Sequence, residues 1–121
     1  MPSAEYHPLQ MPTFFILLSL AEGKKHGYAI LKDVPLISNG RVKLGTGTLY
    51  GALSRLLDQG LITQVPDDAP LSPDEVEGAV DGRPRRLYAL TQSGWRAVEA
   101  EAHRLEGMLS AARARLGVER P

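Results

Sequence analysis

The segment from Gly47 to Leu56 constrains the fold most strongly, because it has the pattern of one short amphipathic helix. Leucines recur at intervals of four and three, the spacing of a single buried stripe on a helix. They are Leu49, Leu53, Leu56 and Leu57. We expect Thr46, which follows Gly45, to be the N-cap, and Gly60 to end the helix as a C′ glycine.

The opposite side of this helix carries small and polar groups. They are Thr48, Tyr50, Gly51, Ser54 and Arg55. A glycine inside a helix costs about 1 kcal/mol relative to alanine, and it is tolerated where another molecule must approach the backbone closely. A helix with an apolar back and a small, polar front suits the major groove of DNA. The alternative is an ordinary surface helix with a solvated face, and this segment alone favours neither.

The charge distribution favours a nucleic-acid partner, although the formal net charge of the chain is zero. The stretch 23–56 contains six cations and one acid, Asp33. These cations are Lys24, Lys25, Lys32, Arg41, Lys43 and Arg55. The stretch 66–81 contains six acids and no cation, and Arg83, Arg85 and Arg86 follow it. A local basic face matters more to a phosphate backbone than the total charge does.

Length and composition predict one small intracellular domain. The chain has 121 residues and no cysteine, which excludes disulfides and thiolate metal sites and suits a reducing cytosol. The first residues lack the pattern of a secretory signal, and the apolar run 14–18 is far too short to span a bilayer. We therefore expect a cytoplasmic protein.

Two further helices are expected before the Gly47–Leu56 segment. The first runs from Pro8 or Pro12 to Ala21, and it is apolar over more than half of its circumference. Part of it, including Phe14 and Leu18, is therefore expected to face another subunit. The second covers 26–34 and is limited by a proline at position 35. Residues 38–40 have turn chemistry, and residues 41–44 alternate like a short extended piece.

Two strands and a loop are expected after the Gly47–Leu56 helix. Residues 61–65 and 86–90 have strand patterns, whereas 66–84 is rich in proline and acids without periodicity and is expected to be a flexible acidic loop. Three helices followed by two strands predict a winged helix-turn-helix. The fold class is therefore mainly α with a small two-stranded wing (α+β), with residues 1–90 as the DNA-binding domain.

The last segment, 91–121, is expected to form a dimerisation helix capped by Thr91 and ending near Leu116. Apolar residues recur along it at alternating intervals of four and three for nearly three heptads, the pattern of a seam between helices. The seam residues are Val98, Ala102, Leu105, Leu109, Ala112 and Leu116. Such a seam requires a partner helix, most simply from a second copy of the chain.

The chain resembles the PadR-like family of bacterial transcriptional regulators over about residues 13 to 100. The matching pieces are Leu20-Ala21-Glu22-Gly23, His26-Gly27-Tyr28-Ala29-Ile30, Gly47-Thr48-Leu49-Tyr50, Leu53, Arg55-Leu56, Gly60-Leu61-Ile62, Asp81-Gly82-Arg83-Pro84-Arg85-Arg86, Tyr88, Leu90-Thr91 and Gly94. Each piece is weak by itself, but the set, in this order, is specific.

The resemblance implies a homodimeric repressor that binds a pseudo-palindromic operator. The third helix would enter the major groove, and the arginine-rich wing would reach the backbone or the minor groove. The single long C-terminal helix is similar to that of the short-tailed branch of the family. The resemblance also implies a small effector, often planar and aromatic or a drug-like cation, that weakens DNA binding.

Three features depart from the family pattern. Pro35 falls where the second helix of the family usually continues, and the loop before Asp81 is long and acidic. An acidic wing would repel phosphates, so its role depends on the three arginines. Trp95 follows Gly94 at the start of the last helix, and the family's ligand-stacking role is not carried over to it.

The candidate DNA contacts are Lys43, Thr46, Thr48, Tyr50, Ser54, Arg55, Arg83, Arg85 and Arg86. Hydroxyls and cations of these types bind phosphates, and the threonine methyl suits thymine. Alternatives stay open: Tyr50 packs on the domain with only its tip exposed, Arg55 pairs with Asp58 or Asp81, and Lys43 is merely solvated. Strand alternation directs Arg85 opposite to its neighbours, so at most two wing arginines face DNA together.

No catalytic, cofactor or metal site is expected. His26 has no second ligand within helical reach, and His103 lies beside the seam. Trp95 and Tyr28 are expected in the core more than as ligand platforms. No nucleophile and base are paired, and Gly45-Thr46-Gly47-Thr48 lacks the lysine of a P-loop. The alternative function, motivated by the acidic loop and the zero net charge, is a winged-helix protein–protein interaction module.

Overall fold

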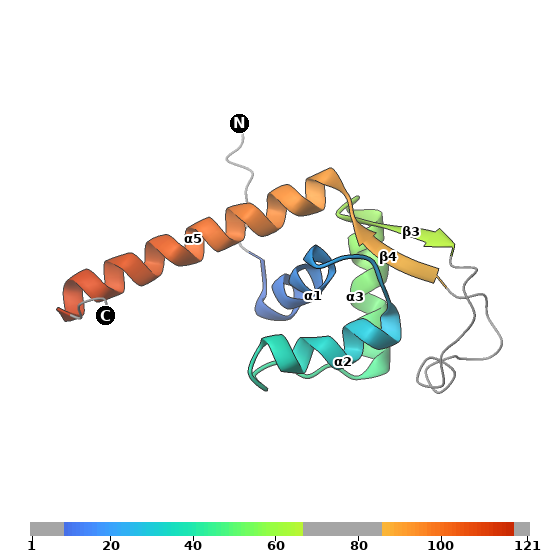
Figure 1. Ribbon diagram of the computed structural model, residues 1–121, viewed down its shortest axis with the longest axis horizontal. Coiled ribbons are helices and arrows are strands. Elements are labelled where there is room, and N and C mark those ends of the chain that lie inside the picture. Colours follow the sequence, from blue (N-terminus) through green and yellow to red (C-terminus); the bar gives the residue numbers. More distant parts are fainter. Residues whose placement is uncertain (1–8, 67–85, 118–121) are drawn as a thin grey trace.

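The computed structural model describes residues 9–66 and 86–117, which form a small helical domain with a long helix leaving it (Figure 1). In chain order the elements are α1 (Met11–Ala21), β2 (Lys25–His26), α2 (Gly27–Ile37), α3 (Thr46–Asp58), β3 (Ile62–Pro66), β4 (Arg86–Leu90) and α5 (Gln92–Leu116). The predicted fold class, mainly helical with a small wing, is confirmed. The predicted acidic loop lies outside the described residues, except for Pro66 at the end of β3.

The core forms where α1, α2 and α3 meet beside the sheet. Each of the three helices contributes two or more buried apolar side chains to it. They include Ile16, Leu17 and Leu20 from α1, Ile30 and Val34 from α2, and Leu49, Leu53 and Leu56 from α3. Figure 1 shows α1 between α5 and α2, so α1 is covered on two sides by its own chain.

The sheet has three antiparallel strands in the order β2-β4-β3. The β3–β4 register pairs Ile62 with Leu90 and Pro66 with Arg86. Strand β2 is not among the predicted elements, and the second predicted helix, 26–34, already includes His26. In the structure Lys25 pairs with Tyr88 and His26 pairs with Leu87. A two-residue strand has no alternation to detect, and only tertiary pairing defines it.

Helix α2 continues three residues beyond the predicted end and contains Pro35 in its last turn. The prediction that Pro35 limits the helix at Val34 is therefore wrong. The proline removes one helical donor, but the following amides still bond, with Ser38 N donating to the Val34 carbonyl (3.1 Å) and Gly40 N to the Pro35 carbonyl (2.8 Å). The helix ends at a turn in which Asn39 and Gly40 have positive φ angles of 53° and 78°, as the turn chemistry predicts.

The segment from Arg41 to Leu44 forms no strand, contrary to the extended piece predicted there. It is instead held by Ser38, whose hydroxyl oxygen accepts from Val42 N (2.9 Å) and lies 3.3 Å from the Val42 carbonyl, to which it donates. The Val42 side chain is buried in the core. This short tether fixes where α3 begins relative to α2.

Helix α3 begins one residue earlier than expected. Gly45 is the N-cap, without a side-chain cap, and Thr46 is already helical, so the prediction of Thr46 as N-cap is wrong. The predicted end is confirmed: Gly60 has a φ of 75° and donates to the Leu57 carbonyl (3.1 Å), while Leu61 N donates to the Leu56 carbonyl (3.0 Å). This pair of bonds is a Schellman motif.

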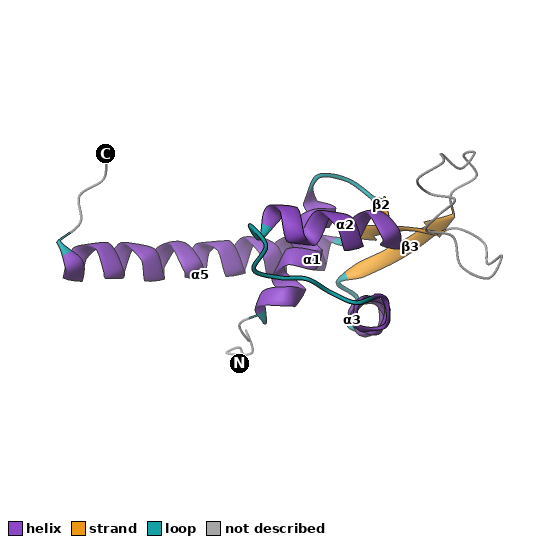
Figure 2. Cartoon of the chain, turned by 90° about the horizontal axis from the view of Figure 1, so that it is seen from below, coloured by secondary structure: helices purple, strands orange, loops and turns teal. Residues whose placement is uncertain are grey.

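Helix α5 is capped by Thr91, as predicted. The Thr91 hydroxyl accepts from Gly94 N (3.0 Å) and donates to the Gly60 carbonyl (2.6 Å), so one side chain joins α5 to the end of α3. Gly94, Val98 and Glu101 are buried, whereas nearly every residue from Ala102 to Leu116 is exposed. The second half of α5 therefore projects from the domain (Figures 1 and 2). Within the described residues, no helix combines the length and apolarity needed to cross a membrane.

Candidate nucleic-acid interface

The side of α3 that faces away from the core is small and polar. Thr46, Thr48, Tyr50, Ser54 and Arg55, all predicted as DNA contacts, are exposed, whereas Leu49, Ala52, Leu53 and Leu56 are buried. By helical spacing, Gly47, Gly51 and Ser54 share the middle of the exposed side. We call these three residues the α3 strip. Figure 2 shows α3 nearly end-on, with one side free of other elements.

The α3 strip has open space above it. Among the described residues, a Cβ atom added to Gly47 would have no heavy atom within 4 Å beyond its own helix, and one added to Gly51 would meet only Arg55 Nη1, at 3.8 Å. Neither glycine has a positive φ angle, so neither backbone conformation requires glycine. Packing within the chain therefore does not explain why these positions lack side chains.

Tyr50 lies at the edge of this face and contacts the first turn of α2. A Cβ atom on Gly27 would lie 2.7 Å from Tyr50 Cζ and closer still to the phenol oxygen. Two fifths of the tyrosine, 39%, stays exposed. The phenol group therefore packs on the domain, as the alternative interpretation held, but its oxygen lies against the Gly27 backbone. Sequence reasoning missed Gly27. The available signal was a glycine inside a predicted helix, at a position where no turn requires one.

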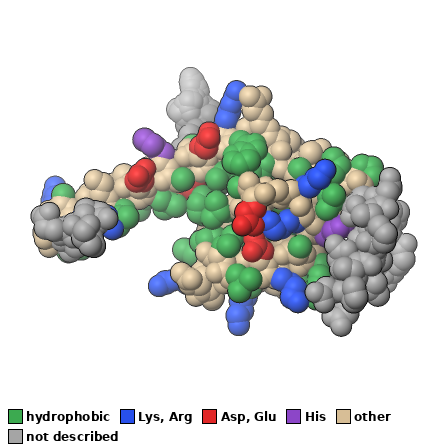
Figure 3. Space-filling view, viewed as in Figure 1, with side chains coloured by type: hydrophobic (Ala, Val, Ile, Leu, Met, Phe, Trp, Pro, Cys, Tyr) green, Lys and Arg blue, Asp and Glu red, His purple; other side chains and the backbone are tan. Residues whose placement is uncertain are grey.

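The cations near α3 differ in their availability. Lys43 and Arg55 are exposed, and within the described residues no ion pair joins Arg55 to Asp58. Asp81, the other proposed partner of Arg55, lies outside the described residues. Figure 3 shows Lys and Arg side chains protruding along the lower edge of the molecule, beneath the α2 region.

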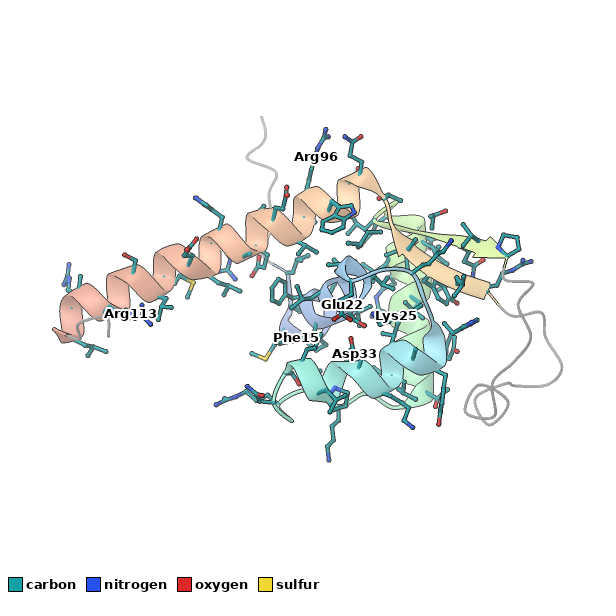
Figure 4. All side chains as sticks on the ribbon, in the orientation of Figure 1. Phe15, Glu22, Lys25, Asp33, Arg96 and Arg113 are labelled. Atoms are coloured by element: carbon teal, nitrogen blue, oxygen red, sulfur yellow. The ribbon has the colours of Figure 1, made fainter. Side chains whose placement is uncertain are left out.

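Lys25 belongs to the basic stretch 23–56, but its ammonium group is bonded within the domain. Its Nζ donates to the Ser19 carbonyl (2.7 Å) and to Glu22 Oε1 (3.1 Å), and its side chain is 19% exposed. Ser19 in turn donates its hydroxyl to Asp33 Oδ2 (2.7 Å). Figure 4 shows Glu22, Lys25 and Asp33 on one side of the domain, between α1 and α2. The basic stretch therefore contributes one cation fewer to a DNA-facing surface than its count suggests.

Of the predicted wing arginines, the structure describes only Arg86, and Arg83 and Arg85 lie outside the described residues. Arg86 is exposed at the first position of β4, opposite Pro66 of β3. Tyr88, two residues later, is buried and accepts from Gln64 Nε2 at 3.4 Å. β4 is thus anchored at its centre and presents Arg86 at the exposed end of the wing.

The predicted dimer residues fall into three groups. Val98 is buried at 6% exposure in the chain's own core, so it is a core residue and not part of an open seam. Phe14 and Leu18 are half-buried and pack against the core. The remaining seam residues are exposed: Ala102, Leu105, Leu109, Ala112 and Leu116. Figure 3 shows hydrophobic side chains along the lower edge of the projecting part of α5.

The remaining candidates give no chemical site. His26 is half-buried in β2 and His103 is exposed, and no group of three potential metal ligands occurs in the part of the chain that the structure describes. The core assignment of Trp95 is wrong, because its side chain is 45% exposed. Tyr28 is half-buried, with Lys32 Nζ 5.2 Å from its ring centroid.

Sequence reasoning also missed Glu101, which is one of the most deeply buried side chains at 2% exposure. Its Oε1 accepts from the backbone N–H of Leu9 (3.2 Å) and from Arg104 Nε (3.3 Å), and Oε2 pairs with Arg104 Nη2. A glutamate and an arginine three positions apart on a helix usually form a solvated pair, so the sequence carries no signal of burial here. The contact with Leu9, just before α1, is one that only the tertiary structure shows.

A helix-turn-helix with an exposed polar helix, followed by an antiparallel wing, defines a winged-helix protein, a class whose members present such a helix to DNA. The sequence profile of the transcriptional regulator PadR-like family matches residues 16–100. The chain therefore belongs to the PadR-like family, whose members are transcriptional regulators and not enzymes.

Solved structures agree with this fold. A PadR family transcription regulator from hypervirulent Clostridium difficile R20291 is 22% identical, with a TM-score of 0.67 over 88% of this chain and 99% of that chain. PadR from Bacillus subtilis, solved in complex with operator DNA, is 21% identical, with a TM-score of 0.59 over 75% of this chain and 47% of that chain. At these identities the likeness shows a shared fold.

One curated relative is similar in sequence. The uncharacterized 37.1 kDa protein in transposon TN4556 of Streptomyces fradiae is 38% identical over 88 residues, which is 73% of this chain. The chain spans 21% of the length of that relative.

Proposed function

We propose that this protein is a sequence-specific DNA-binding transcriptional regulator that places α3 in the major groove. The observation that carries the proposal is the α3 strip. Gly47 and Ser54 are exposed and Gly51 is half-buried, and among the described residues only Arg55 Nη1, at 3.8 Å, lies near a Cβ atom added to either glycine. A side without bulk lets base edges approach the helix closely. Thr48 and Arg55 on one edge and Tyr50 on the other then offer hydroxyls and a guanidinium to bases and phosphates.

Cations next to the strip supply the sequence-independent part of the affinity in this proposal. Lys43 lies immediately before α3, and Arg86 lies at the exposed end of the wing. Each such contact with a phosphate releases counterions, so binding depends steeply on salt. Arg83 and Arg85 remain predicted contacts of the same kind.

The active form in this proposal is a homodimer held by the projecting half of α5. Leu105, Leu109 and Leu116 are 39%, 49% and 75% exposed on a helix that extends into solvent, and Met108 is 56% exposed. An apolar helix face of this kind is stabilised by a second copy across a two-fold axis. Two-fold symmetry then predicts two α3 helices about 34–36 Å apart, one turn of DNA.

The finer parts of the proposal follow from the family. We propose that the protein is a cytoplasmic repressor, that residues 1–90 read DNA while residues 91–121 dimerise, and that a small aromatic or drug-like effector releases the operator. The candidate alternative, a protein–protein interaction module, is favoured by the exposed Asp58 in the last turn of α3, because an acid on this side repels phosphates.

The test is binding to the DNA upstream of the protein's own gene, measured across a salt series with random competitor DNA. We expect competitor-resistant binding whose logarithm falls linearly with the logarithm of salt concentration. The double variant Lys43→Ala and Arg55→Ala should weaken binding by at least about tenfold and reduce the salt slope by about one for each lost phosphate contact.

Arg96→Ala is the matched control, because Arg96 lies on the side of α5 away from α2 (Figure 4) and is exposed. This variant should bind as the parent does. Parent-like binding by the Lys43 and Arg55 variant would refute the assigned face. Absence of any DNA binding at low salt would favour the protein–protein interaction module. If the protein binds, the same assay can be used to screen for an effector. The variant that combines Tyr50→Phe with Lys43→Ala is a second test of the face, and it should also bind the operator more weakly than the parent.

A further inference from the structure

Helix α5 changes its environment abruptly at one residue. Gly94, Val98 and Glu101 lie at intervals of four and three on one side of the helix and are all buried. From Ala102 to Leu116 only Arg104 and Arg113 are even half-buried. Glu101 is therefore the last side chain that fixes α5 to the domain before the helix projects into solvent (Figure 1).

The contact at the other end of the docked half is made by the Thr91 hydroxyl and by the close approach of Gly94 to the backbone of Leu61. Thr91 bonds the Gly60 carbonyl, and a Cβ atom on Gly94 would collide with the Leu61 carbonyl oxygen and lie 3.0 Å from Leu90 Cδ2. This end of α5 is thus pinned to the turn that follows α3. A helix pinned at one point can still tilt about it, so a second fixed point is needed to set its direction.

Glu101 provides that second point. Its carboxylate accepts from the backbone N–H of Leu9 (3.2 Å), in the segment that precedes α1, and from Arg104 one turn further along α5. A buried carboxylate is costly unless it is paired and hydrogen-bonded, and an apolar side chain of similar size often packs at least as stably. The value of the carboxylate here lies in its directional bonds, which join α5 to the start of α1.

We propose that Glu101 is a positioning residue that sets the direction of α5 relative to α3 and thereby the half-site spacing that a dimer accepts. The inference rests on the proposed function, since it concerns how two copies present their α3 helices to DNA. If the projecting halves of two α5 helices pair, the direction of each helix fixes where each α3 lies. A tilt of about 10° moves a point about 20 Å away by about 3.5 Å, close to one base-pair step.

The direction of α5 can be measured without DNA, because the chain has no cysteine and accepts a single pair of spin labels. Gln59→Cys at the end of α3 and Ser110→Cys on the projecting half are both exposed positions. Labelled chains are diluted with unlabelled chains so that pulsed electron resonance reports the distance within one chain. The parent should give a narrow distance distribution, and Glu101→Leu should widen it by about twofold.

Glu99→Leu is the matched control, since it makes the same substitution at an exposed position two residues earlier on α5. It should leave the distribution narrow. Broadening in both variants, or in neither, overturns the assignment to Glu101. If Glu101→Leu does not fold by circular dichroism, Glu101→Met, which keeps the length of the side chain and removes both acceptor oxygens, takes its place with Glu99→Met as control.

The second arm measures affinity for operators whose half-sites are moved apart or together by one and two base pairs. We expect the parent to prefer one half-site spacing and to lose at least about tenfold in affinity when that spacing is changed. Glu101→Leu should lose less than about threefold for the same change. A variant that keeps the parent's spacing preference overturns the proposal. If the parent binds no DNA, the proposed function fails, while the distance measurement still decides whether Glu101 directs α5.

Discussion

At the residue scale, the pair Gly27 and Tyr50 shows how two separate motifs act as one contact. The phenol group of Tyr50 in α3 occupies the place of the missing Gly27 side chain at the start of α2, with Cζ 2.7 Å from an added Cβ. A side chain at position 27 would collide with the Tyr50 ring unless α2 moved as a whole. Glycine is therefore needed there for the ring to approach the α2 backbone closely. The contact fixes the angle between the two helices of the helix-turn-helix.

Gly27→Ala should therefore destabilise the protein by about 1–3 kcal/mol through overpacking. In the Tyr50→Ala background the same change should be nearly neutral, because the ring is absent. A double-mutant cycle by urea denaturation measures the coupling between the two positions. Additive effects would show that the two residues do not compete for the same space.

Gly51→Ala should have the opposite effect on stability. The added Cβ would meet only Arg55 Nη1 at 3.8 Å, an ordinary contact, while the helix gains about 1 kcal/mol of propensity. The midpoint temperature of thermal unfolding should rise by roughly 4–8 °C. If the α3 strip faces DNA, the same variant should bind the operator more weakly despite its greater stability. Equal operator affinity would show that nothing approaches Gly51 closely.

At the element scale, α5 is the helix whose sequence signals are most complete. Thr91 caps it, Gly94 follows at the third position, and Gly117 ends it in the left-handed conformation with a φ of 70°. The same Thr91 hydroxyl donates to the Gly60 carbonyl, so the cap of α5 and the end of α3 share one side chain. The cap therefore acts between elements as well as within one.

Thr91→Val should cost about 1–2 kcal/mol, because it keeps the shape of the side chain and removes both hydroxyl bonds. Urea denaturation followed by circular dichroism measures the change. Thr63→Val on β3 is the control, since Thr63 is exposed and the substitution suits a strand. A loss for Thr91→Val no greater than that of the control would mean that the cap contributes little.

At the scale of the whole molecule, the described residues form a packed head and a projecting arm whose apolar side chains are exposed. The head holds the core and the α3 strip, and the arm is the part of α5 beyond Glu101. Val98 belongs to the head, which shortens the predicted seam to the residues from Ala102 onward. A shorter seam still contains the three leucines on which a dimer would depend.

Leu105→Asp should convert the proposed dimer to monomers, because a charge would be buried in the paired seam without a partner. Light scattering at micromolar concentration measures the mass, and the circular dichroism spectrum should be unchanged, since Leu105 is 39% exposed in the single chain. Ala114→Asp, at an exposed position on the opposite side of α5, is the control and should stay dimeric. A dimeric Leu105→Asp variant would place the interface elsewhere.

The sequence alone determined those helices and strands that have a clear apolar repeat and recognisable residues at their start or end. The leucine stripe with Gly60 defined α3, Thr91 defined the start of α5, and alternation defined β4, because these patterns reflect local geometry. The order of three helices and two strands predicted the winged-helix arrangement, and the polar residues opposite the leucine stripe predicted the exposed side of α3. The family resemblance added the expectation of a homodimer bound to an operator.

Only the tertiary structure decided which side chains are used for packing. β2 exists because Lys25 and His26 meet β4, and α2 continues past Pro35 because the amides that follow still find carbonyls. Tyr50 meets Gly27, Val98 enters the core, Trp95 stays partly exposed, and Glu101 becomes buried under the segment at Leu9. These contacts join residues distant in the chain, and no local pattern of spacing specifies which distant surface will cover a given side chain.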